Sequence, residues 1–381
     1  MRKGWEYKKL GEVCTLISDG SHNPPKGIDN SLYRMISSQN VFDDNLQITE
    51  DNVRYITETD HLCENKRTKL QKDVVLLTIV GTIGRSCVLK RNEGCLTLQR
   101  SVAALHPSDQ IMPRYLMHCL IGNRHTLNQE AHGIAQKGIY LKQLSSLSIP
   151  LPPLSTQLSI VSELDKINEL IRLKKEQHKD FDNLAQSIFY EMFGDPVENE
   201  RGWEVKKISN IAKYHNGVAH EQDIDKDGDF VLINAKFISS EGQIKKYTSI
   251  QRFPLFKNDI VMVLSDLPNG KSLAKCFLID EDNKYTLNQR ICCFRGFDGS
   301  SIYLKNIINR NPYLLSFDNG KGQTNLRKGD VEKIPIPLPP LSLQQLFAQR
   351  IEQIEHQKAE VQKSITDLET LLASRMQYWF E

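Results

Sequence analysis

The sequence lacks the cysteine patterns that build metal sites or disulfide frameworks. It has eight cysteines in 381 residues, but no two are spaced as C-x-x-C and none lies near histidines at zinc-ligand spacing. Several stand inside apolar runs, such as Cys87 before Val88 and Cys292–Cys293 before Phe294. We therefore expect buried, reduced thiols and no zinc module.

Long apolar runs are also absent. No stretch reaches the roughly 18 residues that a membrane span needs, and the segment after Met1 has no apolar core of the kind found in secretion signals. The sequence thus predicts a cytoplasmic protein without a membrane partner. An excess of one charge is missing too, because 49 Lys and Arg oppose 47 Asp and Glu. A surface that binds a polyanion would have to arise from locally gathered Lys and Arg.

Motifs for enzyme chemistry are missing or incomplete. There is no Gly-x-x-x-x-Gly-Lys-Ser/Thr loop for ATP. In Asn23-Pro24-Pro25-Lys26, Lys26 stands where adenine methyltransferases carry an aromatic residue that stacks on a flipped base. Asp223–Asp229 matches half of a calcium loop, but Asn234 replaces the bidentate Glu. The sequence therefore predicts no catalytic residues, no cofactor and no metal, and an acidic turn at Asp223–Asp229.

What the sequence does contain is an internal repeat of four motifs in the same order. Their spacing differs: 198 residues at the Trp motif, 186 at the Asp motif, 190 at the Gln-Arg motif and 187 at the prolines. We therefore expect one scaffold in two copies with loops of different length, and loops often carry specificity. The matching segments begin at Gly4 and Gly202, at Asp73 and Asp259, at Leu98 and Asn288, and at Ile149 and Ile336.

Short mixed elements fill each copy. β-Branched or apolar runs bounded by Gly, Asn or Asp predict strands, and two other segments predict helices. This is an α+β pattern without regular βαβ alternation. The predicted strands are Val74–Val80, Ser86–Lys90, Ser101–Leu105, Asp229–Asn234, Ile260–Leu264, Cys276–Asp280 and Ile291–Phe294, and the predicted helices are Pro113–Ile121 and Ser301–Ile308.

Each copy ends in a proline-rich hinge followed by a long helical pattern. The prolines in Ile149–Pro153 and Ile336–Pro340 require extended backbone, and Ser155 and Ser342 then stand where helix N-caps are expected. About 38 residues with apolar side chains three and four apart follow each hinge, which predicts a helix roughly 57 Å long with a coiled-coil seam.

The predicted fold class is therefore α+β. Two tandem α+β domains are each followed by a long helix, and the two helices pack as an antiparallel coiled coil with pseudo-twofold symmetry. We expect the domains at 1–152 and 196–339 and the helices at 153–195 and 340–381. Lys174, His178 and Lys358 interrupt the apolar seam. They either fix the register of the pair, mark where another subunit docks, or extend their side chains to solvent.

Together these motifs resemble the specificity subunit of type I DNA restriction–modification enzymes. The resemblance covers nearly the whole chain and rests on Gly4-Trp5 with Lys8-Lys9-Leu10, on the Pro-rich hinges that end at Gln157 and Gln344, and on Glu191–Pro196. It implies a non-catalytic subunit whose two target-recognition domains each read one half of a split DNA target. The helix pair would fix the gap between the halves, at most about 17 base pairs for a helix of ~57 Å.

The resemblance also implies partners. They are double-stranded DNA, adenine-methyltransferase subunits and ATP-dependent restriction subunits, with S-adenosylmethionine, ATP and Mg²⁺ expected on those subunits and not on this chain. Two other interpretations stay open. One is a scaffold whose duplicated modules bind proteins and not DNA. The other is an enzyme that itself transfers methyl groups or cuts DNA, which the missing motifs disfavour.

Candidate DNA contacts are loop residues in corresponding parts of the two copies. Small residues let backbone N–H groups approach phosphates, Arg and Lys suit guanine, and Asn and Gln suit adenine. For each residue an ordinary solvated surface position is the alternative. Gln99-Arg100 and Gln289-Arg290 also recur, and a structural role at a strand start competes there with a DNA contact. The candidates are Ser21, His22, Lys26, Gln39, Asn40, Arg85, Lys137 and Tyr140 in the first copy, and His215, Asn216, His220, Asn234, Lys236, Lys271, Lys321, Gln323 and Arg327 in the second.

Overall fold

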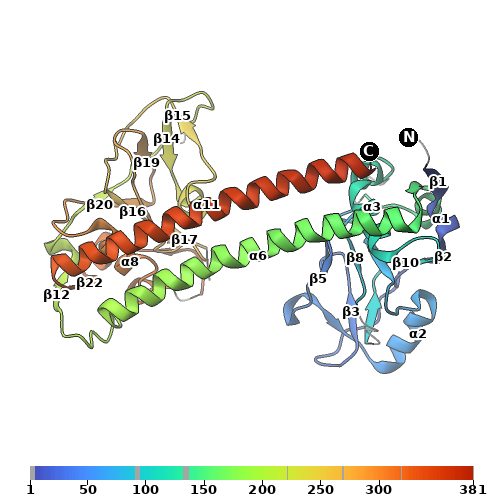
Figure 1. The fold of residues 1–381 in the computed structure, drawn as a ribbon. Coiled ribbons are helices and arrows are strands. Elements are labelled where there is room, and N and C mark those ends of the chain that lie inside the picture. The colour runs from blue at the N-terminus through green and yellow to red at the C-terminus, as the bar shows by residue number, and fades with distance from the viewer. Residues whose placement is uncertain are drawn as a thin grey trace. The chain divides into compact units, whose positions relative to one another are not determined.

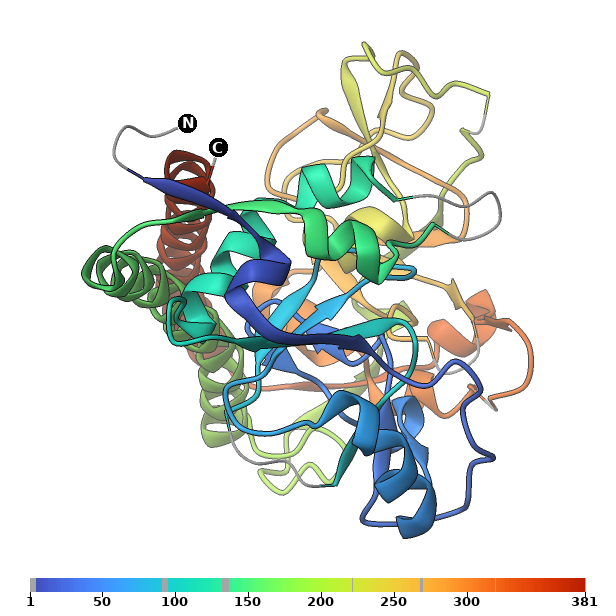
Figure 2. The ribbon, with the colours of Figure 1, turned by 90° about the vertical axis from the view of Figure 1, so that its right-hand side faces the viewer.

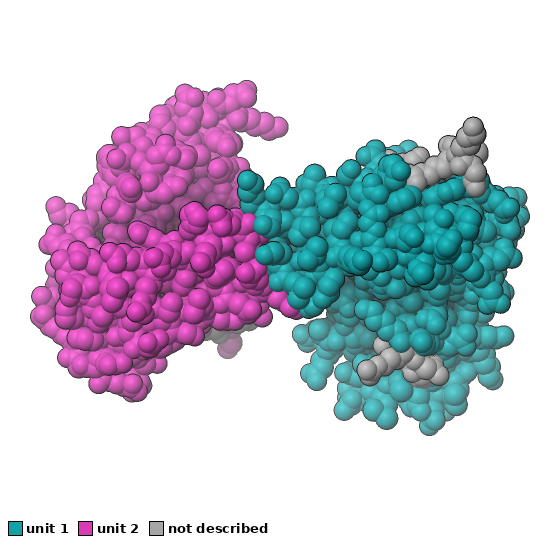
Figure 3. Space-filling model, viewed as in Figure 1, with its two compact units in different colours: residues 1–175, 363–381 teal, residues 176–362 magenta. Residues whose placement is uncertain are grey.

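The protein forms two compact units in the computed structural model, which describes residues 5–90, 95–131, 137–220, 222–267, 270–318 and 320–380 (Figure 1). Unit 1 comprises residues 1–175 and 363–381, and unit 2 comprises residues 176–362 (Figure 3). Two long helices, α6 (Leu154–Phe193) and α11 (Leu341–Phe380), each contribute one part to either unit.

Unit 1 contains two strand layers with short helices around them. Its elements are β1 (Glu6–Lys9), α1 (Leu10–Val13), β2 (Cys14–Asp19), β3 (Arg34–Ile36), β4 (Val41–Phe42), β5 (Asn45–Leu46), η1 (Glu50–Asn52), β6 (Arg54–Tyr55), α2 (Glu58–Thr68), β7 (Val75–Thr78), β8 (Ser86–Val88), β9 (Leu96–Leu98), β10 (Val102–Pro107), α3 (Pro113–Gly122), α4 (Arg124–Gln129), α5 (Leu141–Ser146) and β11 (Ser148–Leu151). The larger sheet has the order β2-β10-β7-β8 and the smaller one β6-β3-β9, while β1 pairs with β11. Figure 1 and Figure 2 both place α2 on the side of unit 1 away from α6.

Unit 2 repeats this strand order. Its elements are β12 (Glu204–Lys207), η2 (Ile208–Asn210), β13 (Lys213–Asn216), β14 (Phe230–Ile233), α7 (Ala235–Ser239), β15 (Tyr247–Thr248), β16 (Ile260–Val263), β17 (Ser265–Asp266), β18 (Cys276–Leu278), β19 (Tyr285–Leu287), β20 (Ile291–Arg295), α8 (Ser301–Ile308), α9 (Pro312–Leu315), β21 (Thr324–Asn325), α10 (Lys328–Val331) and β22 (Pro335–Leu338). The sheets β13-β20-β16-β18, β15-β14-β19 and β12-β22 correspond to β2-β10-β7-β8, β6-β3-β9 and β1-β11 of unit 1. Unit 1 also has the strand pair β4-β5, and unit 2 has the pair β17-β21.

The duplication predicted from the sequence is thus confirmed in the fold, down to single hydrogen bonds. The hydroxyl of Tyr115 donates to the carbonyl of Pro150 at 3.0 Å, and that of Tyr303 donates to Pro337 at 2.8 Å. The hinge glutamines also match, because the buried amide of Gln157 donates to Pro152 and that of Gln344 to Pro339, each at 2.9 Å. Both glutamines therefore hold the extended hinge against the start of the following helix.

The predicted match at the Asp motif is wrong by one residue. The backbone N–H of Asp73 donates to Leu89, and the equivalent bond starts from Asn258, which donates to Ile279. Asp73 and Asn258 also share a left-handed φ of 69°. If the two strands were matched one residue out of step, buried side chains of one unit would be aligned with side chains on the other face of the strand in the second unit. The pattern of burial therefore decides which residues are equivalent.

The Gln-Arg match is displaced in the same way. Gln99 donates its N–H to Ile36, and the residue that makes the equivalent bond to Ile233 is Asn288. Arg100 therefore corresponds to Gln289, and Ser101 to Arg290. The recurring Gln-Arg letters occupy different places in the two turns.

The core of each unit lies on both faces of its larger sheet. In unit 1, Val75, Leu77, Ala103 and Leu105 pack toward α3 and α6, whereas Leu76 and Ala104 pack toward the smaller sheet. Unit 2 divides its core in the same way. All nine predicted strands and helices are confirmed with small shifts at their ends, including β14, while its counterpart β3 was not predicted. The strands β1, β2 and β9, their counterparts β12, β13 and β19, and helix α2 were not predicted either.

The long helices run antiparallel within each unit. In unit 1, Arg375 of α11 pairs with Glu163 of α6, and Lys175 lies 2.7 Å from Glu369. In unit 2, the rings of Phe189 and Phe347 meet at 5.6 Å. The N-cap prediction is wrong, because the helices begin at Leu154 and Leu341 and the carbonyls of Pro153 and Pro340 accept the first N–H bonds. No helix within the described ranges is long and apolar enough to cross a membrane.

Candidate nucleic-acid interface

Several chain segments of unit 1 meet at one end of its strand layers. Strands β2 and β7 end there and β10 begins there, because β10 is antiparallel to both. The ends of β3 and β9 join them, since Gln99 donates its N–H to Ile36 and Ser21 donates to Leu98. We call this region the sheet-end surface of unit 1, and it comprises Ser21–His22, Ser37–Asn40, Val80–Arg85, Gln99–Ser101 and Lys137–Tyr140.

A glycine makes this convergence possible in both units. A Cβ on Gly20 would lie 2.1 Å from the carbonyl oxygen of Leu98, and one on Gly217 would lie 1.9 Å from that of Asn288. No other residue type lacks this atom. The two glycines therefore allow β2 and β13 to run directly against the turns that follow β9 and β19.

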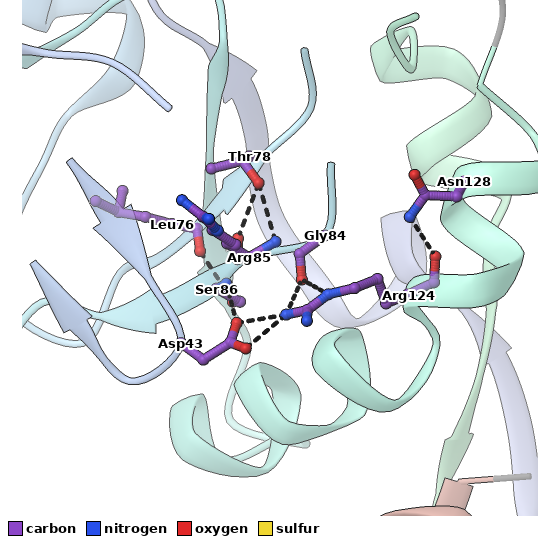
Figure 4. Close-up of polar contacts among 8 residues, drawn as sticks. All are labelled: Asp43, Leu76, Thr78, Gly84, Arg85, Ser86, Arg124 and Asn128. Carbon is purple, nitrogen blue, oxygen red and sulfur yellow. Dashed lines mark hydrogen bonds and ion pairs between the residues drawn. The ribbon is translucent and has the colours of Figure 1, made fainter. Parts of the chain in front are cut away.

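Arg124 of α4 anchors the loop between β7 and β8, as Figure 4 shows. The guanidinium of Arg124 donates to the carbonyl of Gly84 at 3.1 Å and to the carboxylate of Asp43 at 2.5 and 2.7 Å. Thr78 bonds both backbone groups of Arg85. The Arg85 guanidinium stacks over Phe42 at 4.6 Å, so this candidate is held in place at the rim of the surface.

The other candidates of unit 1 differ in accessibility. The His22 ring is 55% exposed, and its Nε2 lies 2.7 Å from Asp19, which also pairs with Arg67. Gln39, Lys137 and Tyr140 are exposed. Ser21 and Asn40 are buried, and Asn40 donates from its amide to Gln47 and Asn52 and accepts from Ser37, so it holds a turn together. Lys26 is exposed and follows Pro25, whose carbonyl accepts from Arg54 of β6.

Unit 2 has a pocket of about 620 Å³ at the corresponding end of its sheets. It brings three predicted residues together: Asn234, Lys236 and Gln323. Asn234 caps α7 by accepting the N–H of Phe237, and Gln323 donates to Ser265 at 3.1 Å. The rest of the lining is Ile224, Leu232, Ala235, Lys246, Ser265, Asp266, Leu267, Asn288, Gln289, Arg290 and Ile291. We call these residues the sheet-end pocket of unit 2.

The remaining candidates of unit 2 do not line this pocket. Lys271, Lys321, Arg327 and Asn216 are exposed elsewhere on the unit, and His215 is half-buried beside Phe253. His220 is buried and bonds to Val218 and Thr286 through its two ring nitrogens, which gives it a structural role. Gln136, next to the candidate Lys137, and Pro268 and Asn269, shortly before the candidate Lys271, lie outside the described residues.

Some lining residues were missed from the sequence. Lys246 and Ile224 come from segments that showed no repeat, and only the Lys245-Lys246 pair signalled a basic surface.

The predicted acidic turn is present in part: Asp225 accepts from Asp227 and from Ser249, and Asp223 pairs with Arg252. Within the described residues no group of three His, Cys, Asp or Glu side chains is placed to hold a metal ion.

A family model decides what this chain is. The model of the type I restriction modification DNA specificity domain matches residues 2–180 and again residues 200–370. The chain belongs to this family. Each match contains one complete set of strand layers with its sheet end, so each specificity domain of the chain carries one of the two surfaces described above.

Curated relatives carry the same kind of name. The specificity subunit of the EcoBI type I restriction enzyme from Escherichia coli is 28% identical over 135 residues, which is 34% of this chain and 28% of that protein. A specificity subunit assigned to the MjaX type I restriction enzyme of Methanocaldococcus jannaschii is 21% identical across 92% of this chain and 87% of its own length. The chain thus spans about a quarter of the first relative and most of the second.

Solved structures share the fold of the paired specificity domains. The S subunit of a type I restriction-modification system from M. genitalium superposes with a TM-score of 0.56 at 12% identity, covering 99% of this chain and 96% of that one. A structure solved in a study of type I R-M complex assembly and conformational transition gives 0.57 at 16% identity, with 100% and 98% covered. At these identities the likeness concerns the fold alone.

The long helix that follows the strand layers of each unit carries the predicted subunit-binding residues. Lys174 and His178 are half-buried on α6. Lys358 is buried at 7% exposure, and its ammonium lies 2.6 Å from Asp182 of α6 and 3.5 Å from Glu241. Burial alone would lower the pKa of Lys358, but the hydrogen bond to Asp182 and the nearby carboxylates outweigh it and raise that pKa. Lys358 thus ties α11 to α6 and to the second specificity domain.

An ion cluster fixes α3 and Asp44 of unit 1 to α6. Arg114 of α3 donates to Asp165 at 2.6 Å and to Asp44 at 2.8 Å, and His118 lies 2.8 Å from Asp165. Burial pushes the pKa of Asp165 upward, but hydrogen bonds from His118 and Arg114 bring it down to about 2. The carboxylate is therefore ionised at neutral pH, where it anchors α3 on the helix.

Proposed function

We propose that this chain is the sequence-specific DNA recognition subunit of a type I restriction–modification complex. Each unit reads one half of a bipartite target through its sheet end. The observation that carries the proposal is the repeated convergence of loops: the same strand ends meet in both units around a required glycine, while the exposed side chains differ. A shared scaffold with different side chains suits two different half-sites, which base edges in the major groove distinguish.

In this function the chain binds partner subunits and carries out no chemistry itself. The helix pair anchors adenine-methyltransferase subunits and ATP-dependent restriction subunits, which bind S-adenosylmethionine, ATP and Mg²⁺. Exposed leucines on both helices, among them Leu158 and Leu170 on α6 and Leu346 on α11, offer apolar surface for such subunits. The chain itself is non-catalytic and works in the cytoplasm, where the DNA lies. Two relatives of the chain are named specificity subunits of type I restriction enzymes, which supports this assignment.

The DNA contacts fall into two groups in this proposal. Exposed residues at the sheet ends, such as Gln39 and Lys137 in unit 1 and Lys236 and Gln323 in unit 2, face the duplex. Buried Ser21, Asn40 and His220 shape the loops that carry them. A protein-binding scaffold is the less favoured alternative, since a pocket that gathers Lys, Arg, Asn and Gln suits phosphates and base edges.

Salt-dependent binding to DNA tests the proposal. The chain with its methyltransferase partner is titrated with a duplex library across salt concentrations. We expect a selected split site and a log–log slope of about −0.9 for each phosphate that is neutralised. Lys236→Ala should make the slope shallower by about one such contact. Lys257→Ala removes an exposed charge just before β16, at the opposite end of the sheet, and should leave the slope unchanged. A flat salt dependence without base preference would contradict DNA recognition.

A further inference from the structure

The turns that precede β10 in unit 1 and β20 in unit 2 differ in one residue type that bears on function. Equivalent backbone bonds place Arg100 with Gln289 and Ser101 with Arg290. Ser101 is half-buried, and its hydroxyl accepts the N–H of Ser38, so it serves the fold of unit 1. Arg290 stands at the same place in unit 2 and is exposed. A structural serine in one unit is therefore an exposed arginine in the other.

The backbone of Arg290 is held in a conformation that arginine disfavours. Its φ is +65°, in the left-handed region where residues with a Cβ are uncommon. Surrounding bonds impose this conformation, because the carbonyl of Arg290 accepts the N–H of Leu264 and the next residue, Ile291, begins β20. Glycine or asparagine would fit the backbone better. Arg310 shares such a φ, but its side chain donates to backbone carbonyls within the unit, whereas Arg290 lines the pocket, and strained residues gather at ligand sites.

The guanidinium of Arg290 has no acceptor among the described residues. Two other arginines of unit 2 do have one: Arg252 pairs with Asp223 and Arg295 with Asp259. Among the described lining residues of the pocket, Asp266 is the acid, and its carboxylate already accepts the backbone N–H groups of Leu267, Ser272 and Leu273. Arg290 is thus an unneutralised cation on the wall of a pocket of about 620 Å³.

We infer that Arg290 is a specificity-determining residue that reads a guanine in the half-site of unit 2; this rests on the DNA recognition proposed above. Two neighbouring donors of a guanidinium match O6 and N7 of guanine in the major groove, and no other base offers that acceptor pair. Asn234 and Gln323 on the same pocket present amides, the groups that suit adenine. The pocket therefore carries a guanidinium beside these two amides, whereas unit 1 has Ser101 at the position of Arg290.

The test uses the full chain assembled with its methyltransferase subunits and a duplex library randomised in both half-sites. For Arg290→Ala we expect the preference for guanine at one base pair of one half-site to fall roughly 10- to 100-fold. The other half-site and the salt slope should stay the same. Lys207→Ala, which removes an exposed charge on β12, is the matched control and should change no preference.

Arg290→Gly separates a binding role from a structural one. Glycine accepts a φ of +65° without strain, so this variant should melt no lower than the wild type while it loses the same base preference. A lower melting temperature with intact preference would overturn the inference. So would uniform weakening on all sequences with a salt slope shallower by about one contact, which marks a phosphate contact. If the wild-type complex selects no split site at all, the proposed function itself has failed.

Discussion

At the residue scale, two glycines allow the close backbone contacts at the sheet ends. Gly20 and Gly217 follow β2 and β13, and the turn carbonyls of Leu98 and Asn288 occupy the space that a Cβ would need. Their position links fold to function, because the same approach gathers the loops of each sheet end. The sequence shows both glycines within candidate loops, but only the backbone contact explains them.

Gly217→Ala should therefore destabilise the protein by about 1–3 kcal/mol, the usual cost of overpacking. The added methyl group meets backbone atoms, which cannot turn aside as a flexible side chain can. Thermal or urea unfolding of the full chain measures the loss. Gly329→Ala is the matched control, since nothing lies within 4 Å of its Cβ position and it stands in α10. Equal stability of the Gly217→Ala and Gly329→Ala variants would refute this account of the glycine.

At the element scale, the helix pair shows what periodicity reveals and what it leaves open. The apolar seam of Ile160, Leu164, Ile167 and Ile171 is buried as its spacing predicts. The spacing could not decide among three roles for Lys358, since a long side chain can snorkel, dock a partner or pair internally. The structure pairs it with Asp182 and Glu241, and its counterpart 187 residues earlier is the buried Ile171.

Lys358→Ile should leave the free energy of unfolding unchanged or raise it by about 1 kcal/mol. The apolar side chain needs no desolvation of charge, and Asp182 and Glu241, at 59% and 60% side-chain exposure, become solvated instead. Asp182→Asn keeps the buried ammonium and removes its nearest carboxylate, so it should destabilise the fold. Chemical denaturation of both variants gives the comparison. A large loss of stability in Lys358→Ile would mean that the charge stabilises the helix pair.

At the scale of the whole molecule, the same sequence offset separates several pairs of equivalent features. The hinges and the helices repeat with an offset of 187 residues, and the boundaries between the compact units, after Lys175 and after Gln362, differ by 187 as well. The recognition segments shift instead, by 185 at β7 and β16 and by 189 at β10 and β20. Constant spacing marks the part that must keep geometry, and varied spacing marks the part that can diverge.

Inserting seven residues after Lys175 and another seven after Gln362 should lengthen the gap in the DNA target. Both helices then grow together by about 10 Å, which corresponds to at most about three base pairs. The two half-sites should stay the same, because neither sheet end changes. Genome-wide mapping of methylated adenines with the altered subunit reports gap and half-sites together. Changed half-sites with an unchanged gap would contradict a helix-set spacing.

The duplication, the α+β class, the proline hinges and the seam of the helices could be predicted from the sequence, because each depends on local periodicity or on the backbone limits of proline. The register of the repeat could not, because it depends on contacts between distant segments. Asp73 and Asp259 look equivalent in sequence, yet hydrogen bonding matches Asp73 with Asn258. The tertiary structure also shows that Asn40 is buried, whereas Arg290 is exposed and without an acceptor among the described residues. Exposure and hydrogen-bond partners depend on segments far apart in the chain, and residue type alone cannot report them.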